Sequence, residues 1–298
     1  MISICIPVYN FKVGKLVNAL NQQGKDAGVP FEIIIIDDCS SPKFRKSNKT
    51  SCSKYTYILL DENIGRSRIR NLFLKYAKFT NLLFLDCDSV IISNMFLHKY
   101  IEEIHTPGFK VVCGGLVCYR NEPPRKFRLR WKYGSIRESC KHTIRNQDPF
   151  QYFKNSNFLI EVEILRKIKF DERIAGYGHE DTLFAYKLMK NEIRVKHIEN
   201  PVLHACKETN SEFLEKTENS IFNLVEILNY VDYDKEFINH VKILKVSNQL
   251  SRMYLNIFVK ISFIIFKSAL KFLLRKGFGG LRALDFYKLG LLKKITPR

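Results

Sequence analysis

Short apolar runs alternate with polar and amphipathic stretches through the first two thirds of the chain. The runs have the length and the β-branched content of buried strands, and several stretches between them repeat apolar residues at helical spacing. Strands are predicted at 2–8, 31–36, 55–60, 82–85, 110–119 and 193–203, and an apolar run at 153–160 leads into 161–167. Helices are predicted at 12–23, 66–79 and 182–190, and a loop or short helix at 41–54.

This alternation predicts an α/β fold with a mostly parallel sheet flanked by helices. The run 110–119 contains Gly114 and Gly115, a pair that permits a bulge or a close backbone approach. Residues 121–145 are basic and predicted to be irregular, as either a flexible lid over a phosphate-bearing ligand or a solvated loop.

The last third of the chain predicts a helical extension. A helix is expected at 211–231, and residues 255–274 are apolar apart from three lysines that lie within about 40° of one another on a helix. Lysines at the centre of a membrane span cost about 2.5–3.5 kcal/mol each, which favours a helix lying in the membrane interface. The alternative is a helical hairpin packed on the body with a solvated basic face.

Composition adds the kind of partner to expect. The chain has 298 residues, 46% hydrophobic, which is enough for a real core, and its net charge is +19. Between residues 241 and 298, 13 Lys and Arg stand against one acid, so about +12 lies there. The candidate partners are nucleotide phosphates, an anionic membrane surface and nucleic acid. The apolar residues between these cations suit lipid better than nucleic acid, so we expect no nucleic-acid partner.

The cysteines indicate the compartment. Eight are scattered without CxxC pairs, and the run 2–8 is followed at once by polar chain rather than by a cleavage site. We therefore expect thiols that are not joined in disulfides and a reducing, cytosolic location.

The first candidate chemistry is the pair Asp86 and Asp88 after the run 82–85. Side chains two residues apart project to the same side of an extended chain, where two like charges repel unless a cation lies between them. A divalent cation such as Mg²⁺ or Mn²⁺ fits this pair. Alternatively, one Asp caps the next helix and the other is solvated.

Two other strand ends are also polar, Asp37-Asp38 and the segment 61–63. Ligands of open α/β sheets bind outside the carboxyl ends of the strands, although Asp and Asn also favour turns. Three such ends in one small domain favour a shared crevice. The sequence has no GxGxxG after the first strand and no Walker A motif, so a dinucleotide fold or a P-loop enzyme is disfavoured.

A second cluster contains Glu180 and Asp181 at the start of the helix predicted at 182–190. Acids in a first helical turn are stabilised by the helix dipole, but such a pair equally supplies a general base and a hydroxyl-binding acceptor. His204 follows the last predicted strand. It is either structural or a nitrogen ligand to a metal.

Five segments in this order resemble glycosyltransferase family 2, whose fold is GT-A: residues 2–10, 32–40, 61–71, 82–89 and 170–184, followed by His204. The resemblance covers about residues 1–206, which we predict to be a nucleotide-sugar-binding catalytic domain, with 207–298 as a basic amphipathic extension. Segments 131–138 and 199–216 resemble a Bacteroidetes-like branch of the family.

The resemblance implies roles for named residues. Those implied to contact the nucleotide are Pro7, Tyr9, Asp37, Asp38, Gly65, Arg70, Asn71 and Asp86, with Asp38 or Asp37 accepting from a uracil N–H. The implied ligands of Mn²⁺ or Mg²⁺ are Asp86, Asp88 and His204. The implied catalytic base is Asp181, with Glu180 binding the acceptor hydroxyl. The chain departs from the family at Cys39, where Gly is common, at Ile69, where Ala is common, and at Ser89, where a third acid often stands.

The expected function is metal-dependent, inverting transfer of a sugar from a nucleoside-diphosphate donor, with a UDP-sugar favoured. The expected acceptor is a hydroxyl of a glycan or a lipid-linked molecule in surface polysaccharide synthesis, at the inner face of the cytoplasmic membrane. One alternative is a nucleotidyltransferase, but the loop 9–14 holds one Gly where that class needs a Gly-rich segment. Another is a basic nucleic-acid- or membrane-binding protein without catalysis.

Overall fold

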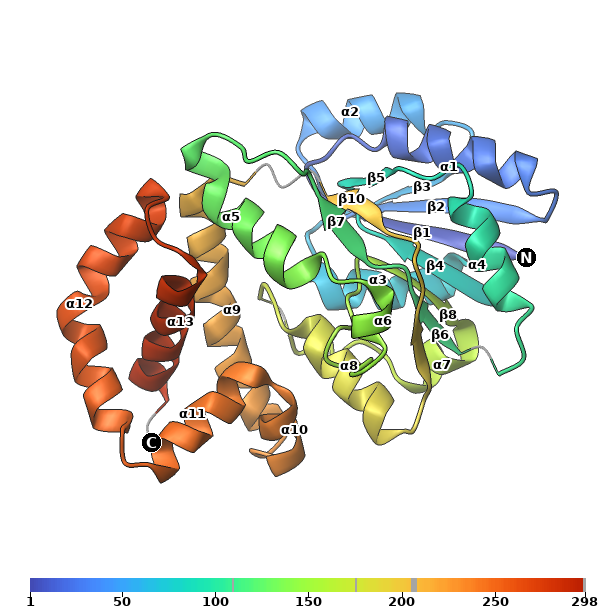
Figure 1. Ribbon diagram of the computed structural model, residues 1–298. Helices are drawn as coiled ribbons and strands as arrows, with labels where there is room; N and C mark the ends of the chain where they lie inside the picture. The colour runs from blue at the N-terminus through green and yellow to red at the C-terminus, as the bar shows by residue number, and fades with distance from the viewer. Residues whose placement is uncertain (109, 175, 205–207, 297–298) are drawn as a thin grey trace. The chain divides into compact units, whose positions relative to one another are not determined.

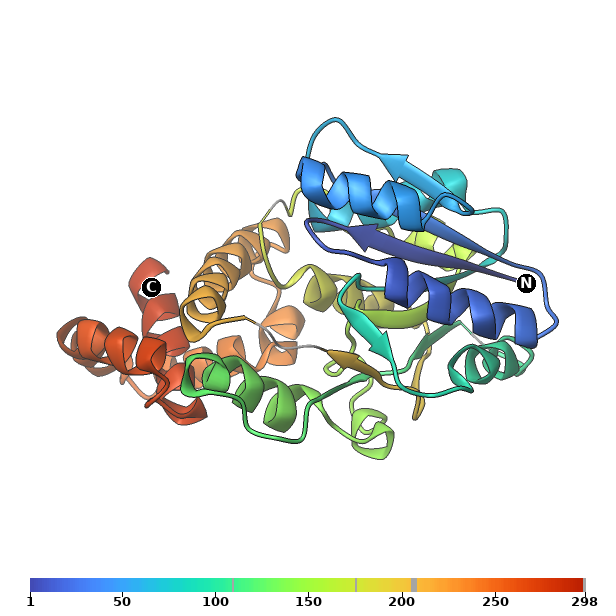
Figure 2. The same cartoon turned by 90° about the horizontal axis from the view of Figure 1, so that it is seen from above.

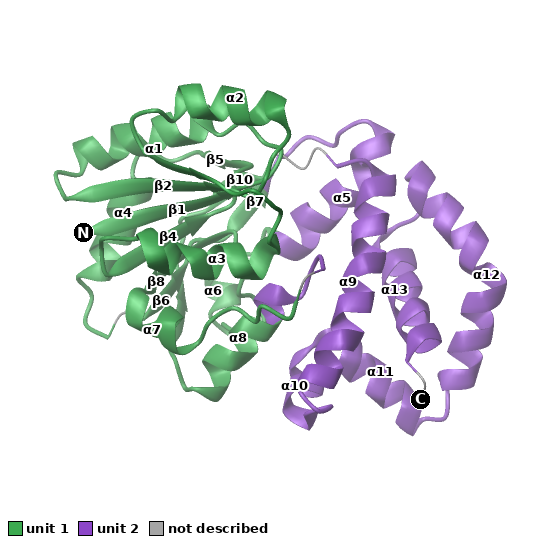
Figure 3. Ribbon diagram, turned by 180° about the vertical axis from the view of Figure 1, so that it is seen from behind, with its two compact units in different colours: residues 1–117, 139–175, 183–205 green, residues 118–138, 176–182, 206–298 purple. Residues whose placement is uncertain are grey.

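The computed structural model of the chain describes residues 1–108, 110–174, 176–204 and 208–296 (Figure 1). It divides into two compact units (Figure 3). The first contains residues 1–117, 139–175 and 183–205, and the second contains 118–138, 176–182 and 206–298. The predicted domain boundary at 206 lies outside the described residues and stays a prediction. Segments 118–138 and 176–182 belong to the second unit, although they precede that boundary.

The first unit is built on a seven-stranded sheet in the order β3-β2-β1-β4-β8-β6-β9. Its strands are β1 Ile2–Val8, β2 Phe31–Asp37, β3 Thr56–Leu59, β4 Asn81–Leu85, β6 Val111–Cys113, β8 Asn157–Glu161 and β9 Val195–His197. β1, β2, β3 and β4 are mutually parallel, as are β6 and β9, and β8 runs antiparallel to both of its neighbours. The predicted α/β fold with a mostly parallel sheet is therefore confirmed.

Helices cover both faces of this sheet because its strands are apolar on both sides. They are α1 Gly14–Asp26, α2 Pro42–Ser51, α3 Gly65–Tyr76, α4 Phe96–Ile104, α6 His142–Arg145, α7 Val162–Lys167 and α8 Glu180–Lys190. Figure 1 shows α1 and α2 on one side of the sheet and α3 and α8 on the other, and Figure 2 shows the first pair from above. Alternate residues of β2, Ile34 and Ile36, belong to a buried core that also contains Phe73 of α3, Leu165 of α7 and Phe184 of α8.

Two predicted strands are wrong, because each is two strands in different sheets. The run 110–119 splits into β6 and β7 Leu116–Cys118, and the run 193–203 splits into β9 and β10 Val202–His204. The later halves join β5 Ser89–Ile91 in a three-stranded sheet of order β5-β10-β7. Gly115 makes the first break possible, because it has a left-handed φ of 87° and a Cβ there would lie 2.6 Å from Cζ of Arg145.

The second unit is helical. Its C-terminal helices are α9 Asn210–Tyr230, α10 Lys235–His240, α11 Lys242–Arg252, α12 Asn256–Lys276 and α13 Leu281–Ile295. The predicted helical extension is thereby confirmed. The prediction that residues 121–145 are irregular is wrong. The segment forms a short 3-10 helix Arg125–Phe127, α5 Arg128–Tyr133, a short π-helix Gly134–Glu138 and α6. None of the described helices is both long and apolar enough to cross a membrane.

The cysteines agree with the prediction as far as they are described. Seven of them are thiols that form no disulfide: Cys5, Cys39, Cys52, Cys87, Cys113, Cys118 and Cys140. Cys206 lies outside the described residues.

Candidate active site

Adjacent carboxylates at the end of β2 have different surroundings. Asp37 is fully buried and accepts hydrogen bonds from the Tyr57 hydroxyl at 2.5 Å and from the Ser40 N–H at 2.8 Å. Asp38 accepts from the backbone N–H groups of Ile64 at 2.7 Å and Gly65 at 3.1 Å, where α3 begins. Burial raises the pKa of Asp38, and those two bonds act against it. Asp37 therefore holds β2 to β3, and Asp38 holds the amino end of α3.

The loops after β1 and β2 are joined to each other. The Asn10 N–H donates to Oγ of Ser40, and the Ser41 N–H donates to Oδ1 of Asn10, both at 2.8 Å. Tyr9 lies in the first loop and is 54% exposed. Cys39, where the resemblance to the family leads us to expect Gly, has a left-handed φ of 63°. The backbone conformation that Gly adopts easily is thus kept here by a residue with a Cβ.

Pro7 lies in β1 beside Ile36 of β2, beyond the last residue of β1 that has a partner in β4. A proline is tolerated at this point because β1 has a neighbour on one side only. Pro7, Tyr9 and Asp38 thus all lie at the carboxyl ends of β1 and β2. Their predicted contact with a nucleobase stays a prediction.

The turn after β4 carries Asp86 and Asp88, and the two acids have different partners. The Ser89 N–H donates to the Asp86 carbonyl at 3.1 Å, which closes a turn between β4 and β5. In the smaller sheet Ser89 lies opposite His204, and this register brings Nε2 of His204 to 2.9 Å from Oδ2 of Asp88. Oδ1 of Asp86 accepts instead from the buried guanidinium of Arg70 at 2.8 Å.

The electrostatics of the two acids follow from these partners. Burial raises the pKa of Asp86, with the charges of Arg70 and Arg66 acting in the opposite direction. Burial also acts to raise the pKa of Asp88, but the hydrogen bond and charge of His204 outweigh it, so this pKa is lowered. Burial and the two flanking acids raise the pKa of Cys87 to about 12. Cys87 is therefore a neutral thiol near pH 7 and is a poor metal ligand.

Arg66 was not among the predicted site residues, although its charge acts to lower the pKa of Asp88 and opposes the rise in the pKa of Asp86. It lies one helical turn before Arg70, whose guanidinium also donates to the Arg66 carbonyl at 3.0 Å. The signal in the sequence was the spacing of four residues, which puts both side chains on the same face of α3.

Two of the three side chains predicted to ligate a divalent cation, Asp88 and His204, lie at a suitable distance from each other. In the described part of the chain, no group of three or more His, Cys, Asp and Glu side chains is arranged to hold a metal. The separation of 2.9 Å between Asp88 and His204 nevertheless fits two neighbouring ligands of one octahedral ion, which lie about 3 Å apart when each is about 2.1 Å from the ion. Asp86 already has a cationic partner in Arg70. The predicted set of three ligands stays a prediction.

Asn71 of α3 binds the protein rather than facing an open site. Its Nδ2 donates to the Phe170 carbonyl and to Oε1 of Glu172, both at 2.9 Å, and its Oδ1 accepts from the Phe170 N–H at 3.0 Å. These bonds fix the segment that precedes the Glu180-Asp181 cluster. The place of Asn71 in the nucleotide wall stays a prediction, and the structure gives this residue a definite positioning contact.

The second predicted cluster lies in the second unit, at the start of α8. Gly178 has a φ of 93°, and a Cβ there would lie 2.6 Å from Cβ of Ser220 on α9. Nδ2 of Asn223, also on α9, donates to the Gly178 carbonyl at 2.7 Å. Glu180 is buried, and Oδ1 of Asp181 accepts from the Thr182 N–H at 2.8 Å. Both acids open α8 as expected, and their catalytic roles stay predictions.

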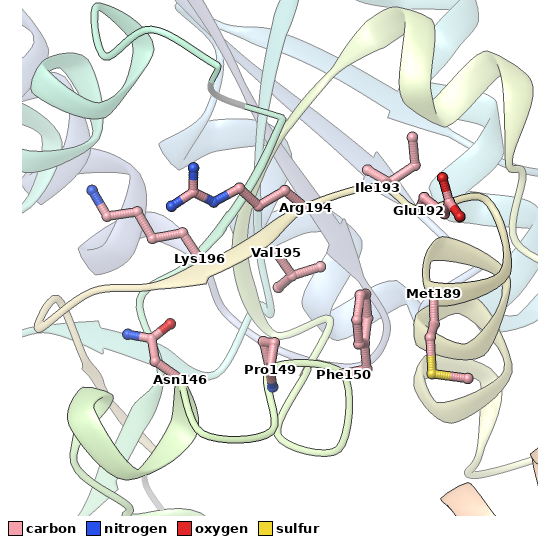
Figure 4. Close-up of a pocket in the computed structure, with 9 residues that line it drawn as sticks. All are labelled: Asn146, Pro149, Phe150, Met189, Glu192, Ile193, Arg194, Val195 and Lys196. Atoms are coloured by element: carbon pink, nitrogen blue, oxygen red, sulfur yellow. The ribbon is translucent and has the colours of Figure 1, made fainter.

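A pocket of about 680 Å³ lies elsewhere, along the edge strand β9 (Figure 4). Its lining residues are Asn146, Pro149, Phe150, Met189, Glu192, Ile193, Arg194, Val195 and Lys196. None of the residues singled out from the sequence is among them. The pocket is therefore separate from the cluster of carboxylates at the strand ends.

Known proteins share both the sequence pattern and the fold. The model of the family "Glycosyl transferase family 2" matches residues 3–168, more than half of the chain. A teichoic acid poly(glycerol phosphate) polymerase of Staphylococcus epidermidis is 25% identical over 199 residues, which are 63% of this chain and 26% of that protein. A chondroitin synthase of Pasteurella multocida is 23% identical over 224 residues, 63% of this chain and 23% of that protein. The chain thus spans about a quarter of the length of these relatives.

Solved structures support the fold assignment. The crystal structure of S. aureus TarS 1–349 matches with a TM-score of 0.53 and 22% identity, over 98% of this chain and 90% of that one. A mannosyltransferase of Pyrobaculum calidifontis, solved in complex with GDP-Man and Mn²⁺, matches with a TM-score of 0.59 and 12% identity, over 98% and 85% of the two chains. The expected GT-A fold is confirmed by these neighbours. The chain therefore belongs to glycosyltransferase family 2.

Proposed function

We propose that the enzyme transfers a sugar from a UDP-sugar to a hydroxyl group, with Mn²⁺ or Mg²⁺ and with inversion at the anomeric carbon. The observation that carries this proposal is the distance of 2.9 Å between Nε2 of His204, in β10, and Oδ2 of Asp88. Asp88 lies in the turn that also holds Asp86, at the carboxyl end of β4. Ligands of open α/β sheets bind at this end of the strands.

In this proposal Asp88 and His204 hold the metal, and Asp86 contacts the ribose or the water shell of the metal. When bound, the ion neutralises charge that develops on the diphosphate leaving group. Arg66 and Arg70 add positive charge at the same place, because both guanidiniums act on the Asp86 carboxylate. Arg70 also fixes the position of Asp86 through a hydrogen bond of 2.8 Å.

The nucleobase is proposed to bind beside the ends of β1 and β2, with Pro7 and Tyr9 as its walls and Asp38 accepting from the uracil N–H. Each oxygen of Asp38 accepts one backbone bond, and a carboxylate oxygen has capacity for a second. Asp37 also accepts one bond on each oxygen, but it is 0% exposed and is bound within the sheet to Tyr57. Asp38 is 5% exposed, so it is the better candidate of the two. The choice of UDP is also supported by crystal structures of TarS 1–349 in complex with UDP and with UDP-GlcNAc.

Asp181 is proposed to be the base that takes the proton of the attacking hydroxyl, with Glu180 binding the same acceptor. One base opposite the leaving group gives a single displacement and hence inversion. The hydrogen bond that Asp181 accepts from the Thr182 N–H fixes the orientation of this carboxylate. A positioned base contributes about 10²–10⁴-fold to the rate.

We propose that the acceptor is a glycan or a lipid-linked molecule in surface polysaccharide synthesis, as the names of the teichoic acid polymerase and the chondroitin synthase suggest. We place the enzyme at the inner face of the cytoplasmic membrane, held there by its C-terminal helices. The support for this location is the charge of residues 241–298, where 13 basic residues stand against one acid.

The test measures binding and transfer separately. UDP is expected to raise the melting temperature of the enzyme only when Mn²⁺ is present, and Asp88→Asn to abolish this shift. Asp181→Asn is expected to keep the shift but to lose at least about 100-fold in transfer from UDP-sugars, with Glu180→Gln as the matched variant. Equal stabilisation by UDP without metal, or stabilisation only by duplex DNA, would contradict the proposal. Full transfer by Asp181→Asn would move the base to another residue.

A further inference from the structure

Helix α12 presents an apolar face to solvent. Figure 1 shows α12 along the border of the second unit, with α13 and α9 on its inner side. Ile257 and Phe258 are each 71% exposed. The outer face, as we name it, consists of Ile257, Phe258, Ile261, Ile264, Ile265, Phe266, Phe272 and Leu273, all of them exposed. At 100° per residue these side chains cover about 200° of the helix circumference.

The packing of α12 fixes which side faces outward. Val259, Phe263 and Leu274 are buried on the opposite side, and the Phe263 ring meets the Tyr287 ring of α13 edge to face, with centroids 5.4 Å apart. Lys271 forms an ion pair of 2.7 Å with Glu218 of α9. Rotating α12 about its axis so that the outer face turned inward would break these contacts. The outer face is therefore exposed because of how the opposite side packs.

The surroundings of the outer face are cationic. Lys260, Arg275 and Lys276 are exposed on the same helix, which has no acidic residue. The only acid between residues 241 and 298 is Asp285, and it pairs with Arg137 at 2.8 Å. An apolar surface of this extent on a protein marks an interaction site. The surface that binds the outer face therefore has to offer apolar groups to the Phe and Ile side chains and negative charge to the cations around them.

A lipid surface meets both requirements, and a second copy of the chain does not. Two outer faces packed against each other would bring the cations of both helices together. A bilayer with anionic lipids offers acyl chains to the Phe and Ile side chains and phosphate groups to the cations. The lysyl stem of Lys260 is long enough to follow the apolar surface while its ammonium group stays in water.

We propose that α12 lies in the plane of an anionic membrane, with its outer face inserted between the headgroups and its Val259-Phe263-Leu274 side packed on the enzyme. This inference rests on the membrane location in the proposed function and deepens it by naming the inserted face. Attachment then depends on apolar insertion as well as on charge, so it differs from adsorption of a basic surface.

The test uses the full chain with vesicles of phosphatidylcholine alone and with phosphatidylglycerol, and measures flotation. The double variant Phe258→Gln/Ile265→Gln is expected to lose at least about tenfold in partitioning to the anionic vesicles. Ile136→Gln makes the same kind of change at a residue that is 62% exposed outside α12, and it is expected to bind like the unaltered chain. The unaltered chain has one tryptophan, Trp131. As a second measurement, the emission that Phe258→Trp adds to that of Trp131 is expected to shift to the blue on these vesicles.

Metal-dependent stabilisation by UDP is measured for every variant, which shows that the variant is folded and tests the donor site independently. Unchanged flotation of Phe258→Gln/Ile265→Gln, or no emission shift in Phe258→Trp, would overturn the proposal. The proposal would also be overturned if the unaltered chain did not float with vesicles but associated with itself, and the double variant abolished this association. The outer face would then join two copies of the chain. Flotation lost by the double variant with UDP stabilisation retained supports the proposal, whatever the transfer assay shows.

Discussion

Replacing Asn71 by Ala should lower the free energy of unfolding of the first unit by more than the loss of one ordinary side-chain hydrogen bond would. Asn71 is buried and binds both the N–H and the carbonyl of Phe170, which is itself 1% exposed. Truncation leaves these two buried backbone groups without their partner, at about 1–3 kcal/mol each. The carboxylate of Glu172 loses a bond as well, but it is exposed and turns to water at little cost. We expect a loss of about 2–6 kcal/mol in the free energy of unfolding.

The matched control is Asn191→Ala. Its Nδ2 donates to the Lys187 carbonyl at 2.9 Å, but at an exposed position, so truncation should change stability by no more than about 0.5 kcal/mol. Equilibrium urea unfolding followed by circular dichroism measures both variants. If Asn71→Ala is as stable as Asn191→Ala, the reasoning from buried backbone partners is refuted.

Asn71→Asp tests the donor separately. A carboxylate keeps the bond from the Phe170 N–H but cannot donate to the Phe170 carbonyl, and burial near Glu172 raises its pKa. The folded state then binds a proton more tightly than the unfolded state, so its stability relative to the unaltered chain is regained as the pH falls. A stability difference that does not change between pH 7 and pH 5 would contradict this account.

Three further predictions concern single contacts. Burial lowers the pKa of His197 to about 4, so the unfolded chain alone takes up this proton as the pH falls below about 6.5, and stability should fall by up to about 3 kcal/mol by pH 4. His197→Gln should reduce this slope in urea unfolding at several pH values. Cys39→Gly should raise the melting temperature in calorimetry, because the φ of 63° costs a Cβ-bearing residue about 1 kcal/mol. Tyr57→Phe should lose about 1.5–3 kcal/mol in urea unfolding, since the buried carboxylate of Asp37 loses a hydrogen bond.

Each of these has a contrary outcome. An unaltered pH slope in His197→Gln would mean that another group carries the acid dependence. A lower melting temperature in Cys39→Gly would mean that the thiol contact with the Arg45 guanidinium, at 3.1 Å, stabilises more than the backbone strain costs. Unchanged stability of Tyr57→Phe would mean that water replaces the hydroxyl beside Asp37.

The strands that could be predicted from the sequence are those buried on both faces. β1, β2 and β4 are such strands, and their predicted bounds differ from the observed ones by at most one residue. The breaks in 110–119 and 193–203 could not be predicted, because apolar content does not report which sheet a residue joins. A Gly-Gly pair is equally consistent with a bulge and with the turn that the structure has at Gly115.

The sequence predicts candidate site residues but not the partners that the structure gives them. Asp37 and Asp38 are adjacent acids, and only the position of Tyr57 on the neighbouring strand decides which of them is bound within the sheet. The capping of α3 by Asp38 joins residues 26 positions apart in the chain, so no local pattern reports it. The pairing of Asp88 with His204 depends on the register of β5 against β10, two strands of three residues each.

Helix α3 is bonded to three of the segments that resemble the family, although these lie far apart in the chain. Its amino end is held by the Asp38 carboxylate from the end of β2, and its Arg70 holds Asp86 after β4. The next residue, Asn71, holds Phe170. Because a helix is rigid over one turn, these bonds fix the three segments relative to one another. A change that displaces α3 should therefore disturb the segments around Asp38, Asp86 and Phe170 together.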